Sequence, residues 1–140
     1  MKATLIALLL SALLNPFSYN KDKTAAKSVV GVWTGTYTVD QLPDMPPHYY
    51  KFTIKKNGKL TTEGTGGDDG VMYHHKGTWE LKGDLFTATY TTLNPRGLPV
   101  TQKATMTLNS EGKFTDATWT DVTNPHGHLD GKFQNLVRVD

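Results

Sequence analysis

Apolar and polar residues alternate with a period of two along most of the chain after Val30. Such alternation is typical of β-strands that bury one face and expose the other. No stretch after Ser28 has the 3.6-residue periodicity of an amphipathic helix. The pattern predicts an all-β domain with eight strands, over residues 30–40, 48–56, 59–66, 71–82, 84–93, 101–109, 113–122 and 128–139.

The same alternation assigns one face of each strand to the interior of the domain. The residues assigned to the inward face are Gly31, Trp33, Gly35, Tyr37, Val39, Tyr50, Phe52, Ile54, Val71, Tyr73, His75, Gly77, Trp79, Leu81, Phe86, Ala88, Tyr90, Gln102, Ala104, Met106, Leu108, Leu129, Phe133 and Val137. In the last segment Arg138 shares the outward face with Asp130 and Lys132. In segment 113–122 the aromatic residues Phe114 and Trp119 have opposite parity, so either a β-bulge lies between them or one of them faces outward.

Short turns and long connections follow one another strictly along the chain. Residues 56–59, 82–84 and 109–112 fit tight reversals, because Asn, Asp and Gly tolerate a positive φ. The long connections cover residues 40–47, 66–70, 93–100 and 121–127. Consecutive turns of an antiparallel meander lie at opposite ends, so the tight turns should close one end and the long loops should surround the other. We therefore expect an antiparallel up-and-down barrel with a closed end and an open end.

Composition supports this prediction and narrows the classes of function. The chain contains twenty-one threonines, and threonine is β-branched and favours strands over helices. The net charge is only +2 and the scattered lysines form no basic stripe, so we expect no nucleic-acid partner. Because the sequence has no cysteine, we expect neither disulfides nor a lipid anchor of the bacterial lipoprotein type.

The N-terminal residues fit a targeting signal. One lysine is followed by an apolar run over residues 3–14, which is too short to span a bilayer and suits the hydrophobic region of a signal peptide. A buried helix or a hydrophobic N-terminal tail is the alternative. We predict a signal peptide over residues 1–20, cleavage between residues 18 and 28, and a barrel domain over residues 28–140. The protein is then secreted or periplasmic, and export without cysteine favours a bacterial protein.

Strand direction places the inward side chains by depth. The large apolar ones lie toward the closed end: Trp33, Ile54, Trp79, Leu81, Phe86, Leu108 and Val137. The polar ones converge on the open end, and we predict that they bind a ligand: Tyr37, Tyr50, Tyr73, His75, Tyr90 and Gln102. Phenols and imidazoles around a cavity suit a small, partly apolar molecule. Alternatively, these groups bond to one another or to water in a filled barrel.

The segment Gly31-Val32-Trp33, followed by Gly35 and Tyr37, resembles the lipocalin signature at the start of the barrel. In lipocalins this tryptophan closes the base of the barrel and packs beside an arginine near the end of the last strand. Arg138 stands where that partner is expected, and a guanidinium over an indole forms a cation–π contact. The resemblance implies that Trp33 and Arg138 have a structural role at the closed end. It is to the small bacterial lipocalin-like proteins or, more broadly, to the calycin group that includes avidins.

Motifs for other chemistry are missing or weak. The sequence contains no cysteine nucleophile, no metalloprotease motif and no phosphate-binding glycine loop, so we assign no catalytic residue and no cofactor. The best metal ligands are His126 and His128, with His48 and Asp68 or Asp69. We interpret these histidines as solvated loop residues and assign no metal site.

Three functions remain open, and the leading one is a secreted barrel that binds a small molecule at its open end. An enzyme would use His75 as a base and Tyr73 or Tyr90 as an acid. An interaction protein, such as a secreted protease inhibitor, would present the stiff loops at residues 43–47 and 94–99 to a protein partner. The volume of the barrel interior discriminates best, because a cavity of roughly 300 Å³ or more supports binding or catalysis.

Overall fold

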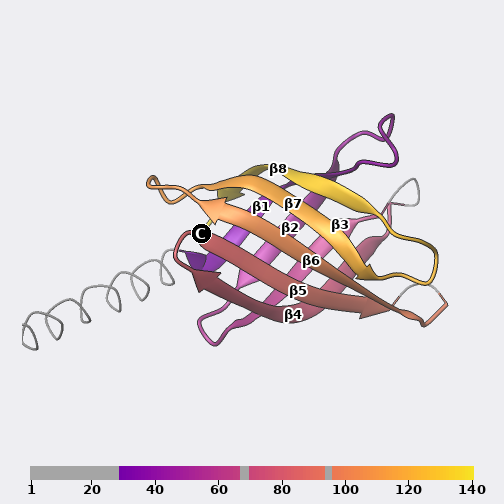
Figure 1. The fold of residues 1–140 in the computed structure, drawn as a ribbon, viewed down its shortest axis with the longest axis horizontal. Coiled ribbons are helices and arrows are strands. Elements are labelled where there is room, and N and C mark those ends of the chain that lie inside the picture. The colour runs from indigo at the N-terminus through magenta and orange to yellow at the C-terminus, as the bar shows by residue number, and fades with distance from the viewer. Residues whose placement is uncertain (1–28, 67–69, 94–95) are drawn as a thin grey trace, which may run out of the picture.

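The structure is a computed structural model that describes residues 29–66, 70–93 and 96–140. Eight antiparallel strands close into one barrel, in which each strand pairs with its neighbours in sequence and the last strand pairs with the first (Figure 1). The strands are β1 Gly31–Val39, β2 His48–Ile54, β3 Lys59–Thr65, β4 Met72–Lys82, β5 Leu85–Leu93, β6 Pro99–Leu108, β7 Phe114–Thr123 and β8 Asp130–Arg138. The expected all-β, up-and-down barrel is confirmed. The predicted signal peptide and its predicted cleavage region lie outside the described residues.

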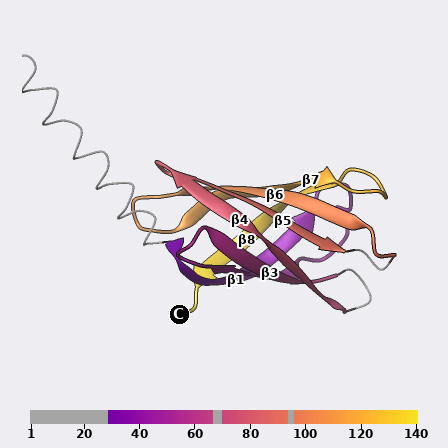
Figure 2. The same ribbon diagram turned by 90° about the horizontal axis from the view of Figure 1, so that it is seen from below.

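The two ends of the barrel differ as expected from the order of the turns. The β2–β3, β4–β5 and β6–β7 turns lie at the end where the chain terminates, and the longer connections lie at the opposite end (Figure 1). The view from below shows the C-terminus and the β7–β8 connection at opposite ends in the same way (Figure 2). Gly58, Gly83 and Gly112 in the tight turns have φ values of 75°, 60° and 72°, in the left-handed region that glycine adopts without a steric penalty.

The closed half of the barrel is filled with apolar side chains. Phe52, Leu60, Phe86 and Met106 are each at most 1% exposed. The Phe86 ring packs against Phe114, with 5.1 Å between the ring centroids. Burial of these apolar side chains stabilises the fold.

Trp33 closes the base of the barrel. Its side chain is 2% exposed, and its indole N–H donates a hydrogen bond to the carbonyl of Val29 at 2.9 Å. The ring lies 4.6 Å from that of Phe114, centroid to centroid. The guanidinium carbon of Arg138 lies 5.6 Å from the Trp33 ring centroid, and the guanidinium also donates to the carbonyl of Val30. The expected contact between Trp33 and Arg138 is therefore present.

A β-bulge in β7 explains the opposite parity of its two aromatic residues. Thr115 and Thr118 pair with two residues of β6 that are only two positions apart, so β7 has one extra residue in this interval. Asp116 takes up the bulge with a φ of 49°. Phe114 and Trp119 consequently both reach the interior, as the sequence analysis allowed.

A second bulge, in β8, corrects the inward face predicted for the last strand. Asn135 has a φ of 55°, and the pairing with β1 shifts by one residue between Thr34 and Thr36. Beyond the bulge Leu136 is buried, whereas Val137 is 56% exposed. The prediction that Val137 faces inward is wrong, and Arg138 lies on the same side as Leu136 instead of the side of Lys132.

The predicted inward position of Val71 is also wrong. Strand β4 begins one residue later, at Met72, and Val71 lies in the preceding loop with 50% of its surface exposed. The backbone N–H of Gly66 donates to the Val71 carbonyl at 2.9 Å, which ends the β3–β4 pairing at this point.

Among the described residues, no helix is both long and apolar enough to cross a membrane.

Candidate functional site

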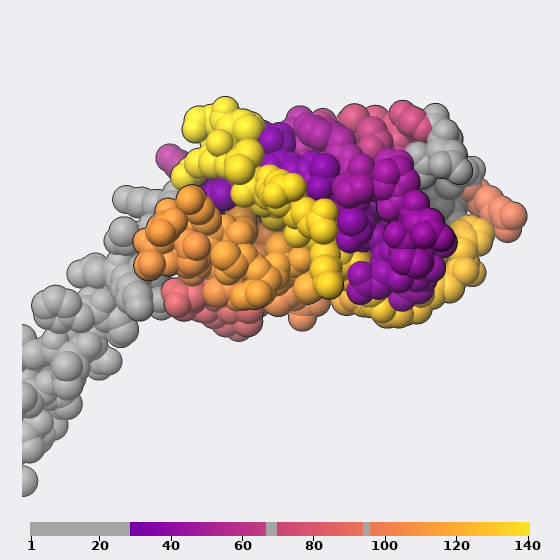
Figure 3. Space-filling view, turned by 90° about the horizontal axis from the view of Figure 1, so that it is seen from above, coloured from indigo at the N-terminus to yellow at the C-terminus, as the bar shows by residue number. Residues whose placement is uncertain are grey.

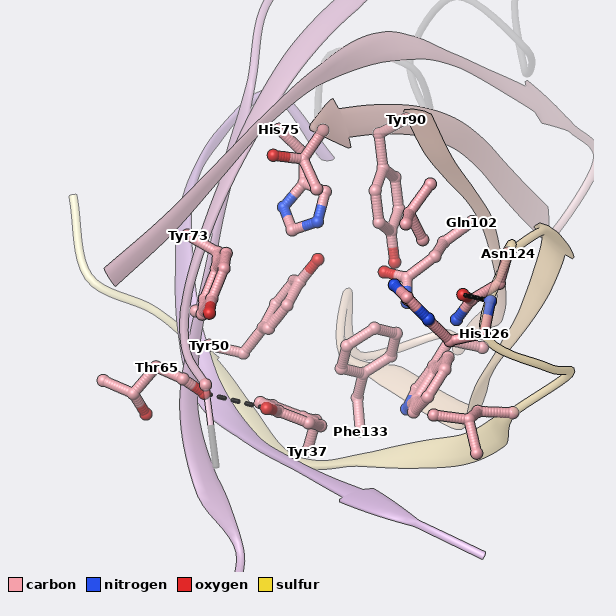
Figure 4. A pocket seen from close by; sticks show the side chains of 16 residues that line it. Tyr37, Tyr50, Thr65, Tyr73, His75, Tyr90, Gln102, Asn124, His126 and Phe133 are labelled. Atoms are coloured by element: carbon pink, nitrogen blue, oxygen red, sulfur yellow. Dashed lines mark hydrogen bonds between the residues drawn. The ribbon is translucent and has the colours of Figure 1, made fainter. Parts of the chain in front are cut away.

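The open half of the barrel contains a cavity of about 610 Å³, within the usual range for ligand pockets. All six residues that the sequence analysis assigned to a ligand site line it: Tyr37, Tyr50, Tyr73, His75, Tyr90 and Gln102 (Figure 4). The sequence analysis did not assign the remaining lining residues: Gly64, Thr65, Gly66, Thr92, Val100, Trp119, Asn124, His126, Leu129 and Phe133. The open half is therefore hollow, although the closed half is filled.

Aromatic rings form a large part of the cavity wall. Tyr50 is central, because its ring centroid lies 5.6 Å from that of Tyr37 and 4.9 Å from that of Phe133. Trp119 packs edge-on to Tyr37 at 6.2 Å and extends the wall toward β7. Offset and edge-to-face arrangements of this kind are the favoured geometries for aromatic pairs. These rings present apolar surface to a ligand.

Glycines on neighbouring strands make room for these rings. Gly64 pairs with Tyr50, and Gly131 pairs with Trp119. A Cβ at Gly64 would lie 2.8 Å from the Tyr50 ring, closer than real Cβ atoms approach other heavy atoms. A Cβ at Gly131 would collide with both the Trp119 indole and the Thr38 carbonyl. The glycines allow the rings to lie flat along the barrel wall instead of filling the cavity.

A hydrogen-bonded chain joins three side chains from adjacent strands. The Tyr50 hydroxyl donates to the Thr62 hydroxyl at 3.0 Å, and the Thr62 oxygen lies 2.9 Å from Nδ1 of His75. Thr62 is 1% exposed, so water does not compete for these bonds. Burial, and secondarily the neighbouring imidazole of His74, lower the pKa of His75 to about 4. His75 is therefore neutral at physiological pH.

The hydroxyl of Tyr90 is the exception in this polar cluster. Tyr90 is 1% exposed, and no described residue forms a hydrogen bond with its hydroxyl. Its ring meets that of His75 at 75°, with 5.4 Å between the centroids. Burial, followed by the neighbouring Tyr50, raises the pKa of Tyr90 well above its usual value, so the phenol keeps its proton.

Asp121 organises the side of the cavity next to β6 and β7. Its carboxylate is 4% exposed and accepts hydrogen bonds from the Gln102 amide at 3.0 Å and the Asn124 amide at 2.8 Å. It also accepts one from the backbone N–H of Leu129 at 3.1 Å. These bonds fix Gln102 and the start of the β7–β8 connection against the cavity. The sequence analysis did not identify Asp121, because it was placed at the edge of a loop.

Hydrogen bonds also hold together the loops around the open end. The Gln41 side chain donates to the Asp130 carboxylate at 3.3 Å and accepts from the Asp130 backbone N–H at 3.0 Å. The space-filling view shows the β1–β2 loop in indigo beside the yellow β7–β8 region at this end (Figure 3). At the opposite side of the rim, the Tyr37 hydroxyl donates to the Thr65 carbonyl at 2.8 Å. The mouth of the cavity is thus a connected structure.

The histidines considered as metal ligands lie in different surroundings. His126 lines the cavity, His48 packs beside Tyr37, and Nε2 of His128 lies 3.0 Å from the Asp130 carboxylate. Within residues 29–66, 70–93 and 96–140, no three His, Cys, Asp or Glu side chains are grouped so that they could hold a metal ion. Asp68 and Asp69 lie outside the described residues.

The site has the location expected for a barrel that binds a ligand at its open end. The architecture of the domain, an eight-stranded antiparallel up-and-down barrel, is compatible with the calycin group. Comparisons of the chain with protein families, with curated proteins and with solved structures find no match.

Proposed function

We propose that the protein is a lipocalin-like barrel that binds a small, uncharged and partly apolar molecule in its open-end cavity. The observation that carries this proposal is the cavity of about 610 Å³ in the half of the barrel where the sequence concentrates tyrosines. Aromatic rings cover the wall, and a few polar groups converge on the interior. This combination is typical of sites that bind small organic molecules.

The lining residues favour an uncharged ligand. Among the described residues that line the cavity there is no Lys, Arg, Asp or Glu. Its buried histidine, His75, is neutral because burial lowers its pKa to about 4. A charged ligand would lose its hydration without gaining a partner of opposite charge, which is strongly unfavourable in a buried site.

Binding is better supported than catalysis. A general base works best when its pKa lies near the operating pH. His75 has a pKa of about 4 and is therefore a weak base at neutral pH. The high pKa of Tyr90 likewise makes its phenol a weak acid. Both groups are better suited to donate hydrogen bonds than to transfer protons.

A protein partner at the open-end loops is the second proposal. Leu42 and Leu98 are 50% and 44% exposed in these loops. Exposed apolar residues beside a cavity suit a contact surface. Part of the second loop, Asn94 and Pro95, lies outside the described residues. The cavity itself favours the small molecule.

A fluorescence titration with N-phenyl-1-naphthylamine, an uncharged apolar probe, tests the proposed binding. We expect probe emission to rise on binding to the unmodified protein. Thr92→Phe places a ring in the cavity and should weaken probe binding about fivefold or more, because overpacking a site costs roughly 1–3 kcal/mol. The matched control is Thr89→Phe on the outer face of the same strand, where Thr89 is exposed. It should bind the probe like the unmodified protein.

Two results would count against small-molecule binding. The first is that the unmodified protein does not bind the probe or any member of a panel of uncharged aromatic compounds. The second is that Thr92→Phe and Thr89→Phe lose affinity equally, which would place the bound probe outside the cavity. Either result would favour the second proposal, a protein partner that binds the loops at the open end.

We also propose that the protein is exported and that residues 1–14 are absent from its mature form. The charged start and apolar run of the N-terminal sequence support this proposal. Intact-mass measurement of the protein isolated from its native source should give an N-terminus between residues 18 and 28. A mass that includes Met1 would overturn the proposed secreted or periplasmic location.

A further inference from the structure

Two polar groups at the inner end of the cavity have no hydrogen-bond partner among the described residues. They are the hydroxyl of Tyr90 and Nε2 of His75, and the rings of both residues lie side by side (Figure 4). The Tyr90 hydroxyl is buried from water, whereas the His75 ring lines the cavity, so that water in the cavity can reach its Nε2. Buried polar groups are almost always paired, and an unpaired one calls for an explanation.

The hydrogen-bonded chain determines which atom of His75 carries the proton. The Tyr50 hydroxyl donates to Thr62, and Nδ1 of His75 is the one other described atom that forms a hydrogen bond with the Thr62 hydroxyl. Because Thr62 is 1% exposed, its own hydrogen is paired only if it donates to Nδ1. The imidazole is neutral, because its pKa is lowered to about 4 by burial. Its single proton is therefore on Nε2, which becomes a hydrogen-bond donor toward the cavity. Thr62 is in this sense a positioning residue.

Tyr90 provides the second donor. The phenol keeps its proton, because burial and the neighbouring Tyr50 hydroxyl raise its pKa. No described residue forms a hydrogen bond of normal length and angle with the Tyr90 hydroxyl. The edge-to-face packing of Tyr90 and His75, at 5.4 Å between ring centroids, holds the two donors on neighbouring strands. The nearest buried carboxylate, Asp121, already accepts hydrogen bonds from Gln102, Asn124 and Leu129. The Tyr90 and His75 donors thus have no acceptor in the protein. A bound ligand could supply one.

We propose that the Nε2–H of His75 and the O–H of Tyr90 together bind the carbonyl oxygen of an uncharged ketone, amide or ester with an apolar body. This inference rests on the proposed function, because it specifies the ligand of the same cavity. A carbonyl oxygen has two lone pairs and accepts two hydrogen bonds. An alcohol or amine would bring a further donor, which the Nε2–H of His75 cannot accept. A carboxylate would meet no cation there and would lie near the charge of Asp121.

The experiment compares two ligands that differ only in this group. 2-Acetylnaphthalene carries a carbonyl, and 2-ethylnaphthalene has the same skeleton without oxygen. Their affinities are measured by displacement of N-phenyl-1-naphthylamine from the unmodified protein and from Tyr90→Phe. In Tyr90→Phe we expect the ketone to bind about threefold to tenfold more weakly, which is the usual worth of one neutral hydrogen bond. The hydrocarbon should bind both proteins equally.

Tyr49→Phe is the matched control, because Tyr49 lies on the outer side of β2 with 39% of its surface exposed. It should leave both affinities unchanged. Equal affinities of the ketone for the unmodified protein and Tyr90→Phe would overturn the carbonyl site. The carbonyl site would also be overturned if Tyr90→Phe bound the ketone and the hydrocarbon more weakly by the same factor. The Tyr90 hydroxyl would then only shape the cavity. In both cases the hydrocarbon and the probe still bind, so the proposed function survives.

A second measurement needs no variant. The infrared carbonyl band of bound 2-acetylnaphthalene should lie at lower frequency than the band of the same ketone in a hydrocarbon solvent, because two donors weaken the C=O bond. A band at the hydrocarbon position would show that no donor reaches the oxygen and would overturn the inference. Failure of the ketone, the hydrocarbon and the probe to bind at all would instead refute the proposed function.

Discussion

Replacing Trp33 by Ala is expected to lower the free energy of unfolding by about 3–5 kcal/mol, the usual cost of removing a buried large aromatic side chain. Trp33 is 2% exposed, and its ring packs on Phe114 at 4.6 Å. The truncation would open a cavity at the closed end and leave the Val29 carbonyl without its indole donor. It would also remove the ring over which the Arg138 guanidinium lies. Urea unfolding followed by circular dichroism measures the loss.

Trp33→Phe is the comparison for this prediction. It keeps an aromatic ring against Phe114 but removes the hydrogen bond to the Val29 carbonyl. We expect a smaller loss, about 1–3 kcal/mol, because less volume is removed and one buried carbonyl loses its partner. A loss under about 1 kcal/mol for Trp33→Ala would mean that the tryptophan does not close the base and that its match to the lipocalin motif is accidental.

The barrel itself could be predicted because local and global signals agree. Period-two alternation gives the strands, and the order of turns gives the two ends. The predicted inward and outward faces are wrong only where the backbone departs from regular strand pairing. The bulge at Asp116 was foreseeable, since Phe114 and Trp119 cannot both be buried without it. The bulge at Asn135 was not, because Leu136 and Val137 are both apolar and either can face the interior.

The candidate site was predictable to the same extent and for the same reason. Inward parity and strand direction together predict how far along the barrel axis a side chain lies. They were sufficient to predict that Tyr73 and Gln102 lie in the same half of the barrel, where both line the cavity. Thr62 gave no comparable signal, because it is one of many threonines and its role depends on contact with two neighbouring strands. Asn124 and His126 reach the cavity through a loop whose conformation alternation does not specify.

The pairing of aromatic residues with glycines contains information that was not used. The sequence analysis assigned no role to Gly64, Gly66 or Gly131. Each is a place where an added Cβ would meet a cavity ring, those of Tyr50, Tyr73 and Trp119 respectively. A glycine within a strand often marks such a close approach. The hollow half of the barrel therefore depends on glycines as much as on the rings they accommodate.

Gly131→Ala is accordingly the second substitution with a large expected effect. The new methyl group would meet the Thr38 carbonyl on one neighbouring strand and the Trp119 indole on the other. It would also separate the indole N–H from that carbonyl, to which it donates at 3.1 Å. Because one obstacle is backbone, it cannot be relieved by a side-chain rotation. We expect the free energy of unfolding to fall by about 3 kcal/mol, at the upper end of the usual cost of overpacking.

Gly64→Ala is the matched comparison, since its nearest obstacle is the Tyr50 ring, 2.8 Å from the added atom, rather than backbone. That ring borders the cavity and can shift into it, so we expect a loss of only about 1 kcal/mol together with weaker binding of N-phenyl-1-naphthylamine. Urea unfolding and probe titration measure both effects. If Gly131→Ala proved as mild as Gly64→Ala, the Trp119 wall would be adaptable. The cavity would then be maintained by the rings themselves and not by the backbone behind them.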